Sequence, residues 1–282
     1  MSSKQHMTLI VEGKYHLDNK IGEGAFGKIF SGVNKNTNHE VAVKIEKKSN
    51  VSPLRNEARI YTALRDVKGI PKMRAWGTEG KFNYLVVDLL GETLEQRRQI
   101  HGGSICLKDV LGIGIQMLER ITDIHKCGLI HRDVKPANFI YGKNANDSNM
   151  LYIIDFGLAK VYRHNREHVS KRGGRMLLGT ARFVSINTHN GISPSRRDDI
   201  ESIGYVMIYL LLGELPWQGI SCDTEQEKHL IGELKKKINL WDLSREKGIP
   251  EEIIFFIEHA RMLDYSEEPD YSFLSNLLLK CR

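Results

Sequence analysis

The chain has 282 residues, 41% of them hydrophobic, and its 41 lysines and arginines outnumber its 35 aspartates and glutamates to give a net charge of +6. This composition excludes a disordered or fibrous protein, because there are enough apolar side chains to bury a core in one large domain or two packed lobes. The positive balance favours anionic partners, of which nucleic acid is only one.

The first third of the chain is predicted to be mainly β-structure. The polar run 34–38 separates the apolar segments 29–33 and 41–45, which indicates a hairpin. Pro53 begins a predicted helix that runs to Leu64, since proline is tolerated in a first helical turn. The run Tyr84–Val87 is typical of a buried strand.

From residue 108 the apolar period changes to three and four. This spacing predicts two core helices, around 111–124 and 200–211, and a third is expected over 253–263. We therefore predict an α+β fold, one domain over 1–282, in which a small strand-rich lobe (1–88) precedes a larger helical lobe (89–282). The hinge is placed at 88–91, and ligands commonly bind in the cleft between two lobes.

The sequence gives no sign of export or membrane insertion. The four cysteines lie far apart and form no Cys-x-x-Cys pair, so neither a disulfide framework nor a zinc site is indicated. Residues 1–13 lack an apolar core flanked by basic residues, and the longest apolar stretch, 203–212, is too short to span a bilayer. We expect a monomer with no membrane partner, located in the cytoplasm or the nucleus.

A glycine cluster precedes the first hairpin, in the run Gly22-Glu23-Gly24-Ala25-Phe26-Gly27. This matches G-x-G-x-x-G, whose glycines let a backbone approach a phosphate closely, although a tight turn with incidental glycines would give the same pattern. A dinucleotide site would need a helix directly after the glycines, whereas Lys28 and Ile29 begin a returning strand. Strand, loop and strand resemble the glycine loop of protein kinases.

Two charged residues fit the same resemblance. Val41-Ala42-Val43-Lys44 is similar to the kinase strand that delivers a lysine to the nucleotide phosphates. Glu57, on the predicted helix that follows, is the natural partner for Lys44, because an unpaired charge inside a cleft is costly to desolvate. Ordinary surface charges are the alternative, which the apolar strand around Lys44 disfavours.

The most specific stretch is His131-Arg132-Asp133-Val134-Lys135-Pro136-Ala137-Asn138. It resembles the kinase catalytic loop, which implies that Asp133 accepts the substrate hydroxyl proton and Asn138 binds magnesium. Lys135 is typical of serine/threonine kinases and would neutralise charge on the transferred phosphoryl group. Asp155-Phe156-Gly157 resembles the second magnesium site, in which Asp155 coordinates the ion.

Later motifs indicate which kinases the chain resembles. Ser185-Ile186-Asn187 stands where most kinases carry A-P-E, and it is followed by Ser195–Tyr205 and Leu215–Gly219. These runs are similar to the casein kinase 1 family, and the resemblance covers 15–279. It implies an ATP- and Mg²⁺-dependent serine/threonine kinase acting on acidic or already phosphorylated protein segments.

The resemblance also implies two further sets of site residues. The nucleotide-binding set is Ile21, Gly22, Glu23, Gly24, Ala25, Phe26, Gly27, Lys28, Ile29, Ala42, Lys44, Val87, Asp88 and Leu90. The substrate-anion set is Arg132, Lys160, Arg175, Arg182, Gly219 and Lys228. Glu225 and Gln226 stand where the family usually has a lysine and an arginine, which reduces one basic patch.

Two other functions remain open from sequence. The missing A-P-E glutamate often anchors the activation segment, so a nucleotide-binding scaffold without turnover is one alternative. A nucleic-acid-binding protein is the other, motivated only by the positive charge. The sequence lacks an aromatic-rich binding motif, zinc ligands or a basic tail, so we expect no specific nucleic-acid partner.

Overall fold

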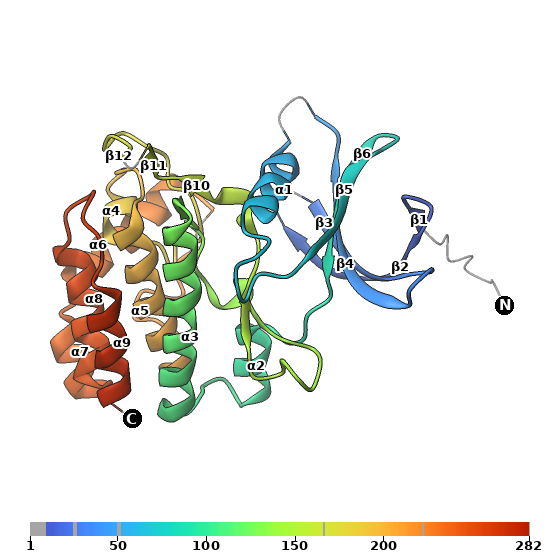
Figure 1. Cartoon of the computed structure of the whole chain (residues 1–282). Coiled ribbons are helices and arrows are strands. Elements are labelled where there is room, and N and C mark those ends of the chain that lie inside the picture. Colours follow the sequence, from blue (N-terminus) through green and yellow to red (C-terminus); the bar gives the residue numbers. More distant parts are fainter. Residues whose placement is uncertain (1–9, 25–26, 50–51, 166, 222, 282) are drawn as a thin grey trace.

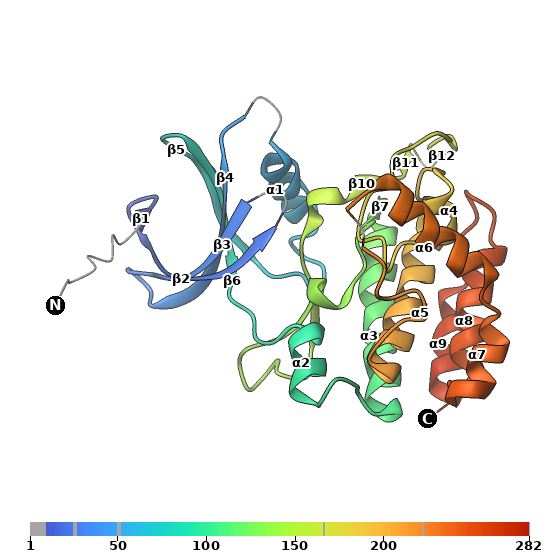
Figure 2. The ribbon, with the colours of Figure 1, turned by 180° about the vertical axis from the view of Figure 1, so that it is seen from behind.

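In a computed structural model the chain forms two lobes, and the structure describes residues 10–24, 27–49, 52–165, 167–221 and 223–281. Figure 1 shows a twisted sheet with one helix at one end of the molecule and a bundle of helices at the other, and Figure 2 shows the same division from behind. The predicted α+β class, with a small antiparallel lobe before a larger helical one, is confirmed.

The small lobe is built on a six-stranded sheet in the order β1-β2-β3-β4-β6-β5, with every neighbouring pair antiparallel. Its strands are β1 (Ile10–Val11), β2 (Tyr15–Gly24), β3 (Gly27–Asn34), β4 (His39–Lys47), β5 (Met73–Glu79) and β6 (Phe82–Asp88). Val41 and Val43 of β4 are fully buried, so the intervening residue, Ala42, and Lys44 point to the opposite face. The hairpin predicted from the apolar runs is thus β3 and β4.

One helix, α1 (Pro53–Ala63), packs between the sheet and the rest of the molecule. Ser52 is its N-cap, and the Ser52 hydroxyl accepts a hydrogen bond from the backbone N–H of Arg55, while Pro53 occupies the first turn as predicted. Leu54, Ala58 and Tyr61 are buried, which fixes the face of α1 that carries Glu57 towards the interior.

The large lobe is mainly helical (Figure 1). Its helices are α2 (Leu94–Ile100), α3 (Leu107–Lys126), α4 (Ile186–His189), α5 (Arg196–Leu212), α6 (Glu225–Lys237), α7 (Leu240–Lys247), α8 (Glu251–Met262) and α9 (Tyr271–Lys280). The large lobe also contains short two-stranded pairs: β7 (Leu129–Ile130) with β10 (Lys160–Val161), β8 (Phe139–Tyr141) with β9 (Leu151–Ile153), and β11 (Arg163–His164) with β12 (Glu167–His168). A 3-10 turn at Pro136–Asn138 precedes β8, and another at Phe156–Leu158 follows β9.

Helix α5 is the centre of the large lobe and differs from what the apolar spacing predicts. The spacing indicates a helix with one buried face that begins near residue 200, but α5 begins at Arg196 and is buried on all sides over 196–210. It lies between α3 and α8, so its charged first turn is enclosed as well. Among the helices of the described residues, none has both the length and the apolar character that a membrane crossing requires.

Candidate active site

Lys44 joins the two lobes. Its Nζ donates to Oε2 of Glu57 at 2.8 Å and to Oδ1 of Asp155 at 2.9 Å. The Lys44 side chain is 13% exposed and that of Glu57 only 3%, so this is a largely desolvated ion pair rather than a surface contact. The structure thus brings together three residues that are 13 and 111 positions apart in the sequence.

The charges of this triad shift one another's pKa values. Burial opposes the charge on Lys44, but the carboxylates of Glu57 and Asp155 outweigh it and raise the lysine pKa to about 12. Burial likewise opposes the charge on Asp155, and the Lys44 ammonium overcomes it to lower the pKa of that carboxyl. Burial raises the pKa of Glu57, and Lys44 only partly offsets this. Lys44 and Asp155 are therefore both charged at neutral pH.

Asp133 is the second centre of the site, and hydrogen-bond donors surround its carboxylate. Its Oδ1 accepts from the backbone N–H of Thr180 at 3.1 Å and from the Thr180 hydroxyl at 2.8 Å. Its Oδ2 accepts from Nζ of Lys135 at 2.6 Å and from Nδ2 of Asn138 at 3.2 Å. These contacts hold a buried carboxylate in one orientation beside a lysine and a hydroxyl. A proton acceptor for an alcohol substrate needs that geometry.

A buried aspartate that sequence reasoning did not single out supports the catalytic loop. Asp199, in the first turn of α5, accepts at 2.8 Å from the backbone N–H of His131 and, with its other oxygen, at 2.8 Å from that of Arg132. Arg132 has φ +69°, an unfavourable conformation for a non-glycine residue, which this pair of hydrogen bonds offsets. The signal was present in the charged run 196–201 at the head of an otherwise apolar helix.

Three rings packed edge to face connect α1 to the catalytic loop. The Phe156 ring lies edge-on to Tyr61 of α1 at 5.0 Å between centroids, and to His131 at 5.4 Å. Phe156 is fully buried, and Nε2 of His131 lies 3.0 Å from the carbonyl oxygen of Ile154. These rings place α1, with Glu57, at a fixed distance from the loop that carries Asp133.

The described nucleotide-binding residues expected from the glycine motif lie at the end of β2 and the start of β3. Gly22 and Gly24 lie in β2, and Gly27 to Ile29 in β3, whereas Ala25 and Phe26 lie outside the described residues. Gly27 has φ +152°, and a Cβ there would lie 2.3 Å from the carbonyl oxygen of Ile45. A Cβ on Gly24 would meet no described atom within 4 Å. Gly27 is therefore required by the sheet, while Gly24 leaves space beside the loop.

This difference predicts separate effects of alanine at the two glycines. Gly27→Ala should lower the free energy of unfolding by about 2 kcal/mol or more, because a side chain is forced against backbone at positive φ. Gly24→Ala should leave stability unchanged and raise the KM for ATP, because its side chain enters the space that a phosphate would use. Thermal denaturation and ATP titration check the pair, and equal destabilisation by both changes would contradict it.

The remaining predicted nucleotide residues lie on β2, β4 and β6 and in the connection that follows β6. Val87 of β6 pairs with Ala42 of β4 and with Met73 of β5, next to the predicted hinge. Ile21 is 52% exposed on β2. Oδ1 of Asp88 contacts Nε of Arg74 on β5 at 2.5 Å and Nε2 of His39 on β4 at 2.9 Å. Leu90 follows β6 in the connection to α2.

Asp155 and Asn138 are a chemically suitable pair for a divalent cation. Asp155 has φ +66° and presents a charged carboxylate, while Asn138 donates its Nδ2 to the backbone oxygen of Asp133 at 2.8 Å. That donation fixes the amide and leaves the Asn138 side-chain oxygen as its atom for coordination. Over the described ranges there is no cluster of three or more histidine, cysteine or acidic side chains. A hard cation held by two protein oxygens and by phosphate fits this donor set.

The predicted anion-binding residues fall into separate groups. Partial burial and then the positive charges of Arg132, Arg172 and Arg175 lower the pKa of Lys160, so these three arginines lie near enough to act on that lysine. Arg172 was not predicted, although it lies in the basic run 171–175. We call Arg132, Lys160, Arg172 and Arg175 the basic cluster.

The other three predicted residues lie outside the basic cluster. The guanidinium of Arg182 lies 5.9 Å from the ring centroid of Tyr209. Nζ of Lys228 pairs with Glu225 at 2.7 Å, so the acidic replacement noted in the sequence occupies this lysine. Gly219 has φ +92° in the turn between α5 and α6.

Comparison with known proteins agrees with this geometry. The family model of the protein kinase domain matches residues 15–278. The chain belongs to the protein kinase family. It is 42% identical over 276 aligned residues to "Casein kinase I homolog 1" of Schizosaccharomyces pombe, covering 96% of this chain and 61% of that protein. It is also 42% identical over 283 aligned residues to "Casein kinase I homolog RAG8" of Kluyveromyces lactis, covering 99% of this chain and 52% of that one.

These relatives support the casein kinase 1 branch that the motifs predicted. The chain spans only about half to three fifths of the length of the two curated relatives. Membership of the protein kinase family implies that ATP and a divalent metal are used.

Proposed function

We propose that this chain is a protein kinase that transfers the γ-phosphoryl group of ATP, with Mg²⁺, to serine or threonine hydroxyls of acidic or already phosphorylated protein segments. The observation that carries the proposal is the double contact of Lys44 with Glu57 and Asp155. It joins the strand-rich lobe to the magnesium-binding carboxylate in the arrangement that phosphoryl transfer needs.

The chain's own residues account for the transfer by positioning and charge. Asp133 would accept the proton of the attacking hydroxyl, since its carboxylate already lies 2.8 Å from the Thr180 hydroxyl oxygen and is held by donors on both oxygens. Lys135 would neutralise charge that develops on the phosphoryl oxygens. Lys44 would hold the nucleotide phosphates, with Glu57 keeping its ammonium in place.

Asp155 and Asn138 would hold the metal ion. When bound, Mg²⁺ supplies charge neutralisation at the phosphate oxygens. Asp155 is available for this because its lowered pKa keeps it ionised at neutral pH. The donations of Nδ2 of Asn138 to the backbone oxygen and to Oδ2 of Asp133 keep the amide from turning its nitrogen towards a cation.

The basic cluster supports the acidic or phosphorylated substrate class. Nε of Arg132 donates to the carbonyl oxygen of Leu158 at 2.6 Å, and burial lowers the pKa of Arg132, which the charge of Asp199 opposes. After partial burial, the positive charges of Arg132, Arg172 and Arg175 lower the pKa of Lys160, so these three cations repel the Lys160 ammonium. A bound anion relieves that repulsion, and guanidinium groups bind phosphate by paired hydrogen bonds.

A pair of peptides tests the substrate preference. We expect the enzyme to phosphorylate a serine peptide with phosphoserine a few residues upstream at least about tenfold more efficiently, by kcat/KM, than the same peptide with alanine there. Arg175→Ala should reduce that ratio, because it removes one cation of the basic cluster. Arg245→Ala, at a side chain 74% exposed on α7, is the matched control and should keep the ratio. Equal rates on both peptides would refute the proposed preference.

A further inference from the structure

The segment 181–186 raises a structural question that the motifs leave open. It connects Thr180, which contacts Asp133, to helix α4, and Ser185-Ile186-Asn187 stands where most kinases have an anchoring glutamate. The segment is irregular, yet Ala181, Phe183 and Val184 are buried. Its buried backbone groups therefore need partners from elsewhere in the fold.

Lys235 of α6 provides two of these partners. Its Nζ donates to the carbonyl oxygens of Ala181 at 2.9 Å and of Val184 at 2.6 Å. The Lys235 side chain is fully buried, and its ammonium lies 4.8 Å from the ring centroid of Tyr205 and 5.1 Å from that of Trp217. Aromatic faces and carbonyl dipoles both stabilise a buried cation.

Trp217 completes the row of carbonyl contacts. Its indole Nε1 donates to the carbonyl oxygen of Arg182 at 2.8 Å, and its side chain is 1% exposed. The carbonyls of residues 181, 182 and 184 are thus each held by a buried side chain from outside the segment. These side-chain contacts add to the turn in which the N–H groups of Phe183 and Val184 donate to the carbonyl oxygen of Thr180, and so restrict the segment further.

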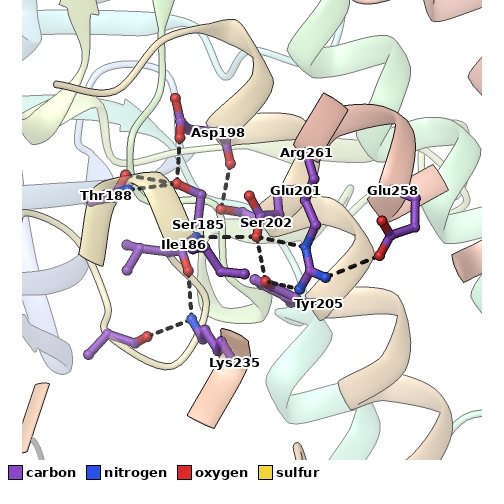
Figure 3. A network of polar contacts seen from close by, with 12 residues as sticks. Ser185, Ile186, Thr188, Asp198, Glu201, Ser202, Tyr205, Lys235, Glu258 and Arg261 are labelled. Atoms are coloured by element: carbon purple, nitrogen blue, oxygen red, sulfur yellow. Dashed lines mark hydrogen bonds and ion pairs between the residues drawn. The ribbon is translucent and has the colours of Figure 1, made fainter. Parts of the chain in front are cut away.

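Glu201 of α5 holds the other end of the segment (Figure 3). Its Oε1 accepts the backbone N–H of Ile186 at 3.2 Å and lies 3.5 Å from Nε of Arg261. Arg261 in turn donates to the Tyr205 hydroxyl at 3.1 Å and pairs with Glu258 at 3.1 Å. A carboxylate from α5 is therefore placed at the segment that lacks its own.

We propose that Lys235 and Glu201 are positioning residues that fix the segment 181–186 and, through Thr180, the catalytic Asp133 and the platform for the phosphoacceptor peptide. The inference rests on the proposed kinase function for its kinetic consequence, whereas its structural consequence can be measured on the folded protein alone. It explains how the segment is anchored without the A-P-E glutamate.

The anchored segment is directly adjacent in sequence to a residue that contacts Asp133. Ala181, whose carbonyl Lys235 holds, follows Thr180, whose N–H and hydroxyl both donate to Oδ1 of Asp133. Displacement of Ala181 therefore moves both donors at once. The hydrogen bonds of Lys44 are to Glu57 and Asp155 and do not involve the segment 181–186. Displacing the segment should therefore weaken peptide binding and phosphate transfer and leave ATP binding unchanged.

Hydrogen exchange measured by mass spectrometry tests the structural part. Lys235→Met keeps the length of the side chain but leaves the buried Val184 carbonyl without its donor and removes one of two partners of the Ala181 carbonyl, the other being Nε2 of His189 at 3.0 Å. Exchange in peptides covering 180–189 should therefore rise at least about tenfold. Peptides covering α9 should keep their wild-type exchange. Lys237→Met, at an exposed lysine two residues along α6, is the matched control.

Kinetics test the functional part. Lys235→Met should raise the KM for a peptide substrate and lower kcat, with kcat/KM reduced about 10- to 100-fold, while the KM for ATP stays within about twofold. Lys235→Arg, which retains a charged donor, should recover part of the loss. Glu201→Gln, which retains an oxygen for Ile186, should be affected less than Glu201→Ala.

Trp217→Phe is a second variant that tests the anchoring if the Lys235→Met protein does not fold. It removes the donor to the Arg182 carbonyl and keeps an aromatic ring beside Lys235. Its effects should have the same pattern at about 3- to 10-fold. Unchanged exchange at 180–189 in both variants would overturn the inference, as would an equal rise throughout both lobes or an equal rise in the KM for ATP. If the wild-type protein transfers no phosphate, the proposed function fails, and the exchange experiment still decides the anchoring.

Discussion

Asp133→Asn is expected to abolish phosphate transfer to protein substrates while ATP still binds. The carboxylate accepts donors on both oxygens, and an amide in its place would turn an NH₂ group towards Thr180 or Lys135 and lose the capacity to take a proton. We expect kcat to fall by about 10²- to 10⁴-fold, the usual contribution of a general base. Steady-state kinetics with an acidic peptide and ATP titration monitored by calorimetry measure the two quantities.

The control for this prediction is Asp66→Asn, because the Asp66 side chain is 87% exposed and lies in the turn after α1. That variant should have wild-type kcat. If Asp133→Asn transferred phosphate at the wild-type rate, the assigned role of Asp133 would be wrong. If it lost ATP binding together with activity, Asp133 would serve the nucleotide rather than the hydroxyl.

Lys44→Met should have the second large effect, on both activity and stability. It removes the only described cation in contact with Glu57 and Asp155, so kcat/KM should fall by about 10²- to 10³-fold as the phosphates lose a positioned charge. The free energy of unfolding at pH 7 should fall by about 2–3 kcal/mol, less than for a fully buried pair because Asp155 is 34% exposed. Lys47→Met, at an exposed lysine on the same strand, is the control.

The pH dependence of this penalty follows from the directions of the pKa shifts. The raised pKa of Lys44, about 12, means that its contribution to stability is complete below its ordinary pKa of 10.5 and is lost as the pH rises towards 12. The lowered pKa of Asp155 means that its contribution is present above its ordinary value of 3.8 and is lost as the pH falls. The penalty of Lys44→Met should therefore be largest between about pH 5 and pH 10.

Chemical denaturation of wild type and Lys44→Met at pH 4 and pH 7 checks this window. At pH 4 the penalty should be smaller, because the raised pKa of Glu57 lets this carboxylate lose its charge at a higher pH than an ordinary glutamate, whereas the lowered pKa of Asp155 keeps Asp155 mostly ionised. The Lys44→Met/Glu57→Gln pair should cost less than the sum of the single changes. An equal penalty at the two pH values would mean that the pair does not carry the charge assigned to it.

The sequence was sufficient to predict the parts of the site that share a local pattern. Lys44 lies in a strand rich in β-branched residues, and Glu57 lies on a helix that begins with a proline. Asp133 belongs to a motif with several defined positions. The secondary structure around each residue could therefore be predicted from its sequence neighbours. Their convergence depended on the resemblance to a family, because no local pattern states that residues 44 and 155 meet. The structure supplies the contact between Lys44 and Asp155 that the resemblance implied.

The residues that were missed are buried charges whose partners are distant in sequence. Asp199 acts on backbone N–H groups 68 and 67 positions away, and Lys235 on carbonyls 54 and 51 positions away. In a sequence, Lys235-Lys236-Lys237 reads as a solvated helix end, and only the fold shows that the first of the three is enclosed by aromatic rings. The all-round burial of α5 was missed for the same reason, since its charged first turn suggests a surface.

The most direct test of the account is transfer of labelled phosphate from γ-labelled ATP, with Mg²⁺, to an acidic protein such as casein, followed by identification of the modified residues by mass spectrometry. We predict label on serine and threonine, dependent on Mg²⁺ and absent for Asp133→Asn. ATP that binds without any label reaching protein would contradict the account, because the triad of Lys44, Glu57 and Asp155 would then serve a nucleotide without turnover.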